Sequence, residues 1–179
     1  MSAQTEYDFK TLIRDIPDFP KPGIVFKDIT PLFQDHKVLS HMLDAMAEPW
    51  KDKNIQVIAG AEARGFLLGP GLAERLKCSF IPVRKPGKLP YDTHACSYDL
   101  EYGSDTLEMH IDAISHGENV LLVDDLLATG GTIKACSDLV SKCGGNVVGA
   151  AFIIELSFLN GRKLLSPAEC QSLIQYDAE

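Results

Sequence analysis

The sequence predicts an α/β protein in which a mostly parallel central sheet is flanked by helices on both faces. Short apolar segments of strand character alternate with segments of helical period along most of the chain. Such alternation implies right-handed βαβ crossovers. Residues 120–123 (VLLV) are also apolar on both faces, as expected of a central parallel strand that is covered on each side. Ligands of such sheets bind beyond the carboxyl ends of the strands, so functional residues are expected there.

The first half of the chain predicts two helices and two strands. Apolar side chains recur at helical spacing over residues 36–50, which predicts the first helix. An apolar strand follows at 55–59, then a helix at 65–76 and a strand at 78–83. Residues 85–94 contain prolines and a glycine and show no period, which predicts a loop.

The second half of the chain continues the alternation. Residues 97–102 and 106–111 alternate or nearly so, and we expect them to pair as a hairpin. Residues 130–143 place apolar side chains on one helical face, and the glycine pair that follows would end this helix. Residues 146–155 then form the next buried strand.

The composition is that of one ordinary globular domain over residues 1–179. The chain is 45% apolar and 23% charged, which excludes a disordered or fibrous protein. A chain of this length buries roughly 70% of the surface of its unfolded form. No internal repeat and no linker divides it.

Nothing in the sequence marks export or membrane insertion. The longest apolar run, 147–154, has eight residues, whereas a bilayer span needs about 20. The N-terminus is polar and acidic, unlike a signal peptide. The five cysteines are odd in number and form no CxxC pair. We therefore expect reduced thiols in the cytoplasm and no zinc site.

The charge is unevenly distributed along the chain. The net charge of −8 argues against binding to nucleic-acid backbone. Residues 60–90 nevertheless carry a local balance of +4, and residues 91–125 a balance of −9. On charge alone, two solvated faces would explain this pattern, whereas the motifs in these segments indicate a binding site.

The strongest motif is DDLLATGGT, which follows the predicted strand 120–123. Asp124 and Asp125 are two adjacent carboxylates at a strand end, where they require a cationic or hydroxyl-rich partner. The loop that follows is small enough to turn its amides inward, and it opens a helix whose N-terminus favours an anion. The loop residues are Ala128, Thr129, Gly130, Gly131 and Thr132. This order of strand, acidic pair, small-residue loop and helix N-terminus predicts a site for a phosphorylated sugar rather than a plain glycine-rich turn.

Two other segments supply positive charge. In GAEARG (60–65) a small-residue loop lies between a strand and a helix, with Arg64 beside it, and this is again an anion-binding pattern. Arg84, Lys85 and Lys88 follow a predicted strand within five residues. Each segment could also be a plain turn or a solvated basic patch.

These motifs resemble the phosphoribosyl-pyrophosphate (PRPP) signature of the type I phosphoribosyltransferases. Four further blocks carry the resemblance: 17–32 (PDFPKPGIVFKDITPL), 60–69 (GAEARGFLLG), 84–90 (RKPGKLP) and 97–103 (SYDLEYG). The first and the last of these resemble the adenine-specific branch of the family. The resemblance therefore implies transfer of phosphoribose from PRPP to adenine, giving AMP and pyrophosphate. It also implies a homodimer, a small N-terminal hood (about 1–34) and a flexible catalytic loop (about 85–103).

The resemblance also assigns residues to the adenine pocket. Phe26 would stack on adenine, the backbone at Val25 would read its Watson–Crick edge, and Leu126 would close the opposite face of the ring. Many family members have Arg where this chain has Lys27, so a backbone role is the one expected there. From the residues alone, the prolines and Gly23 exclude a helix over 17–32, and a hood loop pinned to the core by Phe26 is the simpler expectation.

The resemblance implies the catalytic groups as well. Glu101 would accept the proton that adenine loses from N7, and Tyr102 would help to shape the closed loop. Arg64 would contact the leaving group together with Lys85 and Lys88, and a cis peptide would join Glu62 and Ala63. Mg²⁺ would be held mainly by PRPP, without strong protein ligands.

Two other functions remain open at this point. A related transferase could act on hypoxanthine, guanine, xanthine or a pyrimidine, although residues 23–28 and Glu101 argue against it. A PRPP-sensing binding module could keep the loop without catalysis. The acidic net charge opposes a DNA-binding role for such a module.

Overall fold

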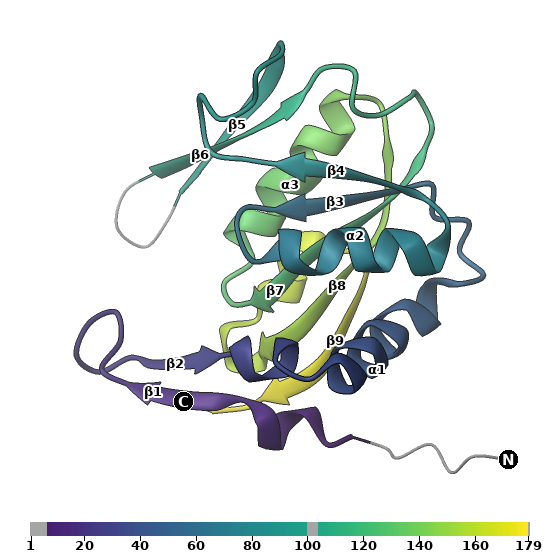
Figure 1. Cartoon of the computed structure of the whole chain (residues 1–179). Coiled ribbons are helices and arrows are strands. Elements are labelled where there is room, and N and C mark those ends of the chain that lie inside the picture. The colour runs from purple at the N-terminus through teal and green to yellow at the C-terminus, as the bar shows by residue number, and fades with distance from the viewer. Residues whose placement is uncertain (1–6, 100–103, 179) are drawn as a thin grey trace, which may run out of the picture.

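The protein is built on a five-stranded sheet, which confirms the predicted fold class. The computed structural model describes residues 7–99 and 104–178. The strand order is β4-β3-β7-β8-β9, and all neighbouring pairs are parallel. The strands are β3 (Val57–Ala61), β4 (Ser79–Val83), β7 (Asn119–Leu127), β8 (Asn146–Leu156) and β9 (Glu169–Tyr176). In Figure 1 their arrowheads point toward the left side of the molecule, where the carboxyl ends gather.

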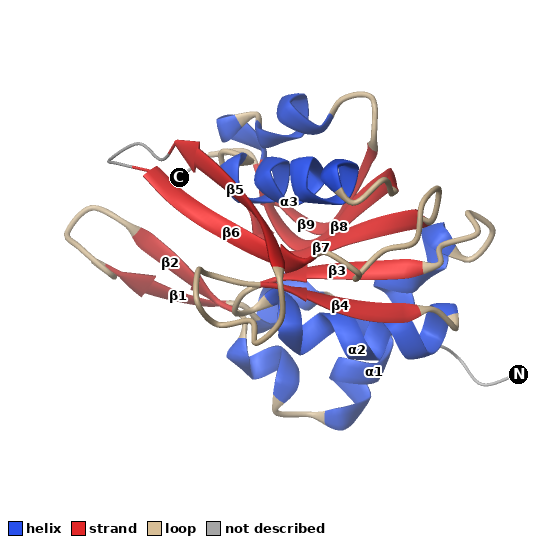
Figure 2. Cartoon of the chain, turned by 90° about the horizontal axis from the view of Figure 1, so that it is seen from above, coloured by secondary structure: helices blue, strands red, loops and turns tan. Residues whose placement is uncertain are grey.

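Helices cover both faces of the sheet. Figure 2 shows α3 (Gly131–Lys142) on one face and α1 (His36–Ala47) with α2 (Gly65–Leu76) on the other. Each face has its own apolar cluster, one containing Leu43 and Leu72 and the other Ile133 and Leu139. The central strand β7 contributes to both clusters, as expected of a strand covered on each side.

Glycines let α2 lie close to the sheet. A Cβ at Gly65 would approach the Val123 carbonyl oxygen to 2.7 Å, and one at Gly69 would lie 2.1 Å from the Phe80 ring. Helix α2 therefore forms despite its glycines and Pro70, because packing on the sheet outweighs their low helix propensity. This packing brings the start of α2 to the carboxyl end of β7.

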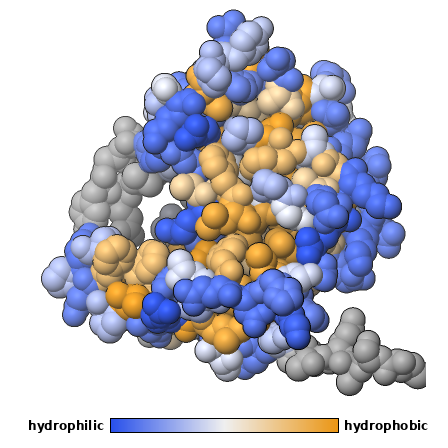
Figure 3. All heavy atoms as spheres, viewed as in Figure 1, coloured by the Kyte–Doolittle hydropathy of each residue, from blue (hydrophilic) through white to orange (hydrophobic). Residues whose placement is uncertain are grey.

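Two antiparallel hairpins flank the carboxyl ends of the sheet (Figure 1). The predicted hairpin is confirmed as β5 (Thr93–Asp99) with β6 (Ser104–His110). The second hairpin, β1 (Arg14–Pro17) with β2 (Val25–Asp28), replaces the simple loop expected for the hood. The turn of the hood exposes Phe19 and Ile24, and apolar surface is visible on this hairpin in Figure 3.

Several element boundaries differ from the sequence predictions, and three of these differences have a clear physical or positional description. Strand β7 runs on to Leu127 instead of ending at Val123, because its carboxyl half pairs with the long apolar strand β8. Strand β3 lies two residues later than the predicted 55–59. Helix α1 ends at Ala47 and continues as a 3-10 helix, since Pro49 has no N–H for a helical hydrogen bond.

Short 3-10 helices complete the fold. They are Phe9–Leu12, Thr30–Phe33, Glu48–Trp50, Ser157–Leu159 and Gly161–Leu165. In the part of the chain that the structure describes, no helix is long and apolar enough to cross a membrane. All five cysteines are free thiols.

Candidate active site

The acidic pair lies within the carboxyl half of β7. Asp125 is 4% exposed, and its carboxylate accepts a hydrogen bond from Arg64 Nε at 2.5 Å. The Asp125 amide donates to Asp124 Oδ1 at 2.9 Å. Burial, together with the charge of Asp125, raises the pKa of Asp124 well above its ordinary value of 3.8. The predicted pairing of these carboxylates with a cation is therefore confirmed for Asp125.

Arg64 joins three parts of the site. It stands at the N-cap position of α2, pairs with Asp125 in β7, and lies over the ring of Phe26 in the hood at 5.4 Å. Its side chain remains 45% exposed, so it can still reach a ligand. The peptide bond between Glu62 and Ala63, one residue before Arg64, is cis, as the family resemblance implied.

The small-residue loop that follows β7 lines a cavity of about 200 Å³. The lining contains both aspartates, Arg64 and the whole segment 126–133. Gly130 caps α3 with φ +89°, a left-handed conformation that glycine adopts without strain. The first turn of α3 thus opens onto the cavity, which suits an anion at the positive end of the helix dipole.

The back of this loop rests on the Gly161–Leu165 helix. A Cβ at Gly130 would lie 2.6 Å from the Gly161 carbonyl oxygen, and a Cβ at Gly161 would lie 2.3 Å from the Ala128 carbonyl oxygen. The Arg162 guanidinium binds both carboxylate oxygens of Glu155, which is 3% exposed at the end of β8. The ion pair of Arg162 with Glu155 holds the Gly161–Leu165 helix, and therefore the back of the loop, in place.

A second cavity of about 300 Å³ adjoins the first and shares Arg64, Asp124, Asp125 and Thr132 with it. Its other lining residues come from the β5–β6 hairpin and from the ends of β3 and β4: Glu62, Ala63, Lys85, Tyr98, Asp105 and Leu107. The Tyr98 hydroxyl lies 3.4 Å from both Asp105 Oδ2 and Thr132 Oγ1. The hairpin is therefore linked to the loop after β7.

The basic residues after β4 already have carboxylate partners. Lys88 Nζ and Arg84 Nε lie 3.1 and 3.2 Å from the Glu62 carboxylate. Lys85 pairs with Asp105. The structure thus brings the +4 segment and part of the −9 segment of the sequence together around one cavity.

The hood residues lie on the Arg64 side of the site. Phe26 packs edge-on against Phe19 at 5.2 Å and contacts Arg64, but it belongs to neither apolar core cluster. The expectation that Phe26 pins the hood to the core is therefore wrong; it contacts the site instead. Val25 is exposed. Lys27 Nζ binds Asp15 Oδ1 at 2.8 Å and lies over the Tyr176 ring.

Some site residues fall outside these contacts. Glu101 and Tyr102 lie outside the described residues. Sequence reasoning missed Asp105 and Gly161, and it gave Tyr98 no role. Gly161 left no local signal, because only the fold brings it behind Gly130. Among the described residues, no group of three or more His, Cys, Asp or Glu could hold a metal ion.

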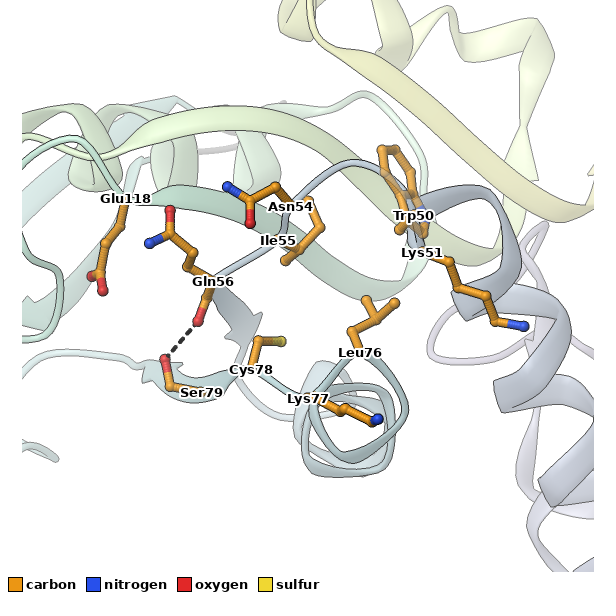
Figure 4. Close-up of a pocket in the computed structure, with 10 residues that line it drawn as sticks. All are labelled: Trp50, Lys51, Asn54, Ile55, Gln56, Leu76, Lys77, Cys78, Ser79 and Glu118. Atoms are coloured by element: carbon orange, nitrogen blue, oxygen red, sulfur yellow. Dashed lines mark hydrogen bonds between the residues drawn. The ribbon is translucent and has the colours of Figure 1, made fainter.

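A larger cavity, of about 550 Å³, lies at the amino ends of the strands. Figure 4 shows its lining, from Trp50 after α1 to Cys78 before β4 and Glu118 before β7. Ser79 Oγ donates to the Gln56 carbonyl oxygen at 3.1 Å there. None of the predicted site residues lines it. Ligands of parallel sheets bind at the opposite end, so the two smaller cavities are the candidate active site.

Comparison with known proteins shows which family the chain resembles. Residues 32–175 match the phosphoribosyl transferase domain family. An adenine phosphoribosyltransferase of Maridesulfovibrio salexigens is 55% identical over 168 residues, which cover 94% of this chain and 99% of the relative. The solved structure of the Thermoanaerobacter pseudethanolicus enzyme of that name is 51% identical with a TM-score of 0.91, covering 94% of this chain and 98% of its own.

A third comparison includes bound molecules. The Saccharomyces cerevisiae adenine phosphoribosyltransferase, complexed with an imino-altritol bisphosphate and adenine, is 40% identical with a TM-score of 0.87 and covers 92% of this chain and 96% of its own. The fold and the site have the groups expected of a protein that binds a phosphorylated sugar. The chain belongs to the phosphoribosyltransferase family and, within it, to the adenine phosphoribosyltransferases. The enzyme class expected from the sequence, a pentosyl-transferring glycosyltransferase, is confirmed.

The raised pKa of Asp124 predicts a pH-dependent cost in stability. A carboxyl whose pKa is higher in the folded than in the unfolded protein stabilises the fold below its ordinary pKa, and this contribution is lost as pH rises through the folded-state pKa. Asp124→Asn removes the charge and should raise the melting temperature at pH 8. This gain in melting temperature should shrink toward zero as the pH falls to 3.8, the ordinary pKa of an aspartate. Thermal unfolding across pH measures this; a gain that is absent or independent of pH contradicts it.

The contact behind the loop predicts a binding defect for Gly161→Ala. The new methyl would collide with the Ala128 carbonyl oxygen and displace the loop after β7. Because hydrogen bonds to a charged phosphate contribute about 1.5–3 kcal/mol each, we expect the KM for PRPP to rise at least about tenfold, with a smaller change in kcat. Gly71→Ala in α2, where a Cβ would meet only the Leu43 side chain, is the control. An unchanged KM for PRPP in Gly161→Ala would show that the loop does not depend on this support.

Proposed function

We propose that this chain transfers the 5-phosphoribosyl group of PRPP to adenine at the carboxyl end of β7, giving AMP and pyrophosphate. One observation carries the proposal. Two carboxylates, a guanidinium and a small-residue loop at a helix N-terminus line one cavity. These groups complement the hydroxyls and the phosphate of a sugar phosphate.

The ribose 5-phosphate part of PRPP would bind the acidic pair and the loop after it. Asp124 and Asp125 accept hydrogen bonds from the ribose hydroxyls, and the amides and hydroxyls of the loop bind the 5-phosphate. The loop residues are Ala128, Thr129, Gly130, Gly131 and Thr132. Support comes from their place around the cavity of about 200 Å³ at the start of α3.

The pyrophosphate part would lie in the adjoining cavity, toward the basic residues. Arg64 lies at the boundary of the two cavities, where it can contact the bond that breaks. Lys85 lines the second cavity, and Lys88 reaches Glu62 on its wall. As pyrophosphate leaves, the ribose gains oxocarbenium character, which the two aspartates stabilise electrostatically.

Adenine would bind between the hood and the end of β7. Phe26 stacks on one face of the ring and Leu126 closes the other, while the Val25 backbone reads its edge. The ion pair of Lys27 with Asp15 supports a backbone rather than a side-chain contribution at that position. Support also comes from the position of Phe26 beside Arg64, because Arg64 lines the cavity proposed to hold the ribose.

The carboxylates around the two cavities also fit a magnesium ion bound together with PRPP. Oxygen ligands are the ones that Mg²⁺ prefers, and it commonly keeps substrate phosphates and waters in its shell. Asp124 and Asp125 are the oxygen donors that would face it. When bound, Mg²⁺ would neutralise charge on the pyrophosphate.

Glu101 is our candidate for the proton acceptor at N7 of adenine, and Tyr102 for a residue that shapes the closed site. Residues of about 85–103 would close over PRPP, which excludes water as a competing nucleophile. We further propose that the protein acts as a homodimer in the cytoplasm. The free cysteines support a reducing compartment.

The proposed reaction is tested by incubating the protein with PRPP, Mg²⁺ and a panel of free bases, with nucleotide and pyrophosphate measured. Formation of AMP from adenine, with little product from hypoxanthine or guanine, is expected. Product from another base would identify a different transferase. PRPP binding without any product would identify a PRPP-sensing module.

The role of Glu101 predicts a selective loss of turnover. General-base catalysis contributes about 10²–10⁴ to a rate, so Glu101→Ala should lower kcat at least about a hundredfold. PRPP affinity, measured by calorimetry, should stay nearly unchanged. Glu108→Gln, on β6, serves as a control that removes one carboxylate charge. Wild-type turnover in Glu101→Ala would exclude it as the proton acceptor.

A further inference from the structure

The carboxylate of Glu62 lies among the basic residues that follow β4, Arg84, Lys85 and Lys88. It accepts hydrogen bonds from Lys88 Nζ at 3.1 Å, Arg84 Nε at 3.2 Å and the Lys85 amide at 3.0 Å. Its side chain is 12% exposed, and Glu62 lines the cavity that also contains Arg64. Burial alone would raise the pKa of Glu62, but the three hydrogen bonds outweigh it and lower the pKa.

The donors that meet Glu62 are the kind that bind phosphate. A guanidinium, an ammonium and a backbone amide converge from a short segment on two oxygens, as they would on a phosphate group. Because the carboxylate of Glu62 is charged, it keeps these cations close together despite their mutual repulsion. The cations are thus arranged for an anion while the chain itself provides one.

We propose that Glu62 is a resident anion that the pyrophosphate part of PRPP displaces from Arg84 and Lys88. This inference rests on the proposed position of pyrophosphate in the second cavity. Glu62 is a positioning residue, because it acts through the cations rather than on the reacting atoms. Its charge lowers the affinity for pyrophosphate, since each new contact replaces an existing ion pair, and so favours release of that product.

Lys85, between Arg84 and Lys88, has a different carboxylate partner. Lys85 pairs through its ammonium with Asp105 on β6, and only its backbone amide binds Glu62. Removing the charge of Glu62 therefore frees two cations and leaves the Lys85 ion pair in place. The Glu62→Gln variant keeps an oxygen that can accept a hydrogen bond from the Lys85 amide, so the local backbone structure should be retained.

Calorimetry with pyrophosphate and Mg²⁺ tests the inference on wild type and Glu62→Gln. The two ion pairs are partly exposed, and such pairs contribute only modestly, so freeing the two cations should give a modest gain in affinity. We expect Glu62→Gln to bind pyrophosphate roughly fivefold more tightly, and its KM for PRPP to fall while its KM for adenine stays the same. Unchanged or weaker pyrophosphate binding in Glu62→Gln overturns the inference.

Two further variants make the test specific. Glu108→Gln removes a carboxylate that accepts from the Gly87 amide in the same segment but pairs with neither cation; its affinity should match wild type. In a Lys88→Ala background, the gain from Glu62→Gln should shrink, and a full gain there contradicts the displacement. Absence of pyrophosphate binding to the wild-type protein overturns the proposed pyrophosphate site itself, which a failure confined to Glu62→Gln does not.

Discussion

The ion pair between Arg64 and Asp125 is the interaction on which the site depends. It joins the turn between β3 and α2 to the carboxyl end of the central strand, and Arg64 extends this link to Phe26 in the hood. A buried carboxylate without a partner would be strongly destabilising. The pair therefore gives the buried Asp125 carboxylate a cationic partner at the base of the cavity and gives the neighbouring loop a fixed edge.

The rest of the site repeats the same arrangement, in which charge of one sign meets charge of the other. Lys85 meets Asp105, Arg84 and Lys88 meet Glu62, and Arg162 meets Glu155 behind the loop. Asp124 is the exception, since burial and its charged neighbour both raise its pKa. A protein of net charge −8 can thus hold a small polyanion, because its cations are gathered and held in place by its own carboxylates.

Much of this arrangement follows from local sequence. Helix α2 was predicted at Gly65–Leu76, where it is found, because the apolar pattern of this segment is a local signal, although packing on the sheet is what offsets its glycines and Pro70. The contacts that organise the site are not local. Gly161 supports Gly130 from 31 positions away in the chain, and the hood strands pair across a turn rich in proline and glycine that resembles a plain loop. The length of β7 likewise depends on its pairing with β8, which cannot be predicted from the sequence of β7 alone.

The central claim is that the acidic pair and the loop after β7 bind the ribose phosphate of PRPP. Calorimetry of PRPP with Mg²⁺ on the double variant Asp124→Asn/Asp125→Asn tests it most directly. Hydrogen bonds to charged groups contribute about 1.5–3 kcal/mol each, so PRPP affinity should fall at least about tenfold. Asp138→Asn, at a surface ion pair of α3, should bind as wild type does. Unchanged affinity in the double variant would contradict the assignment of the ribose site to these residues.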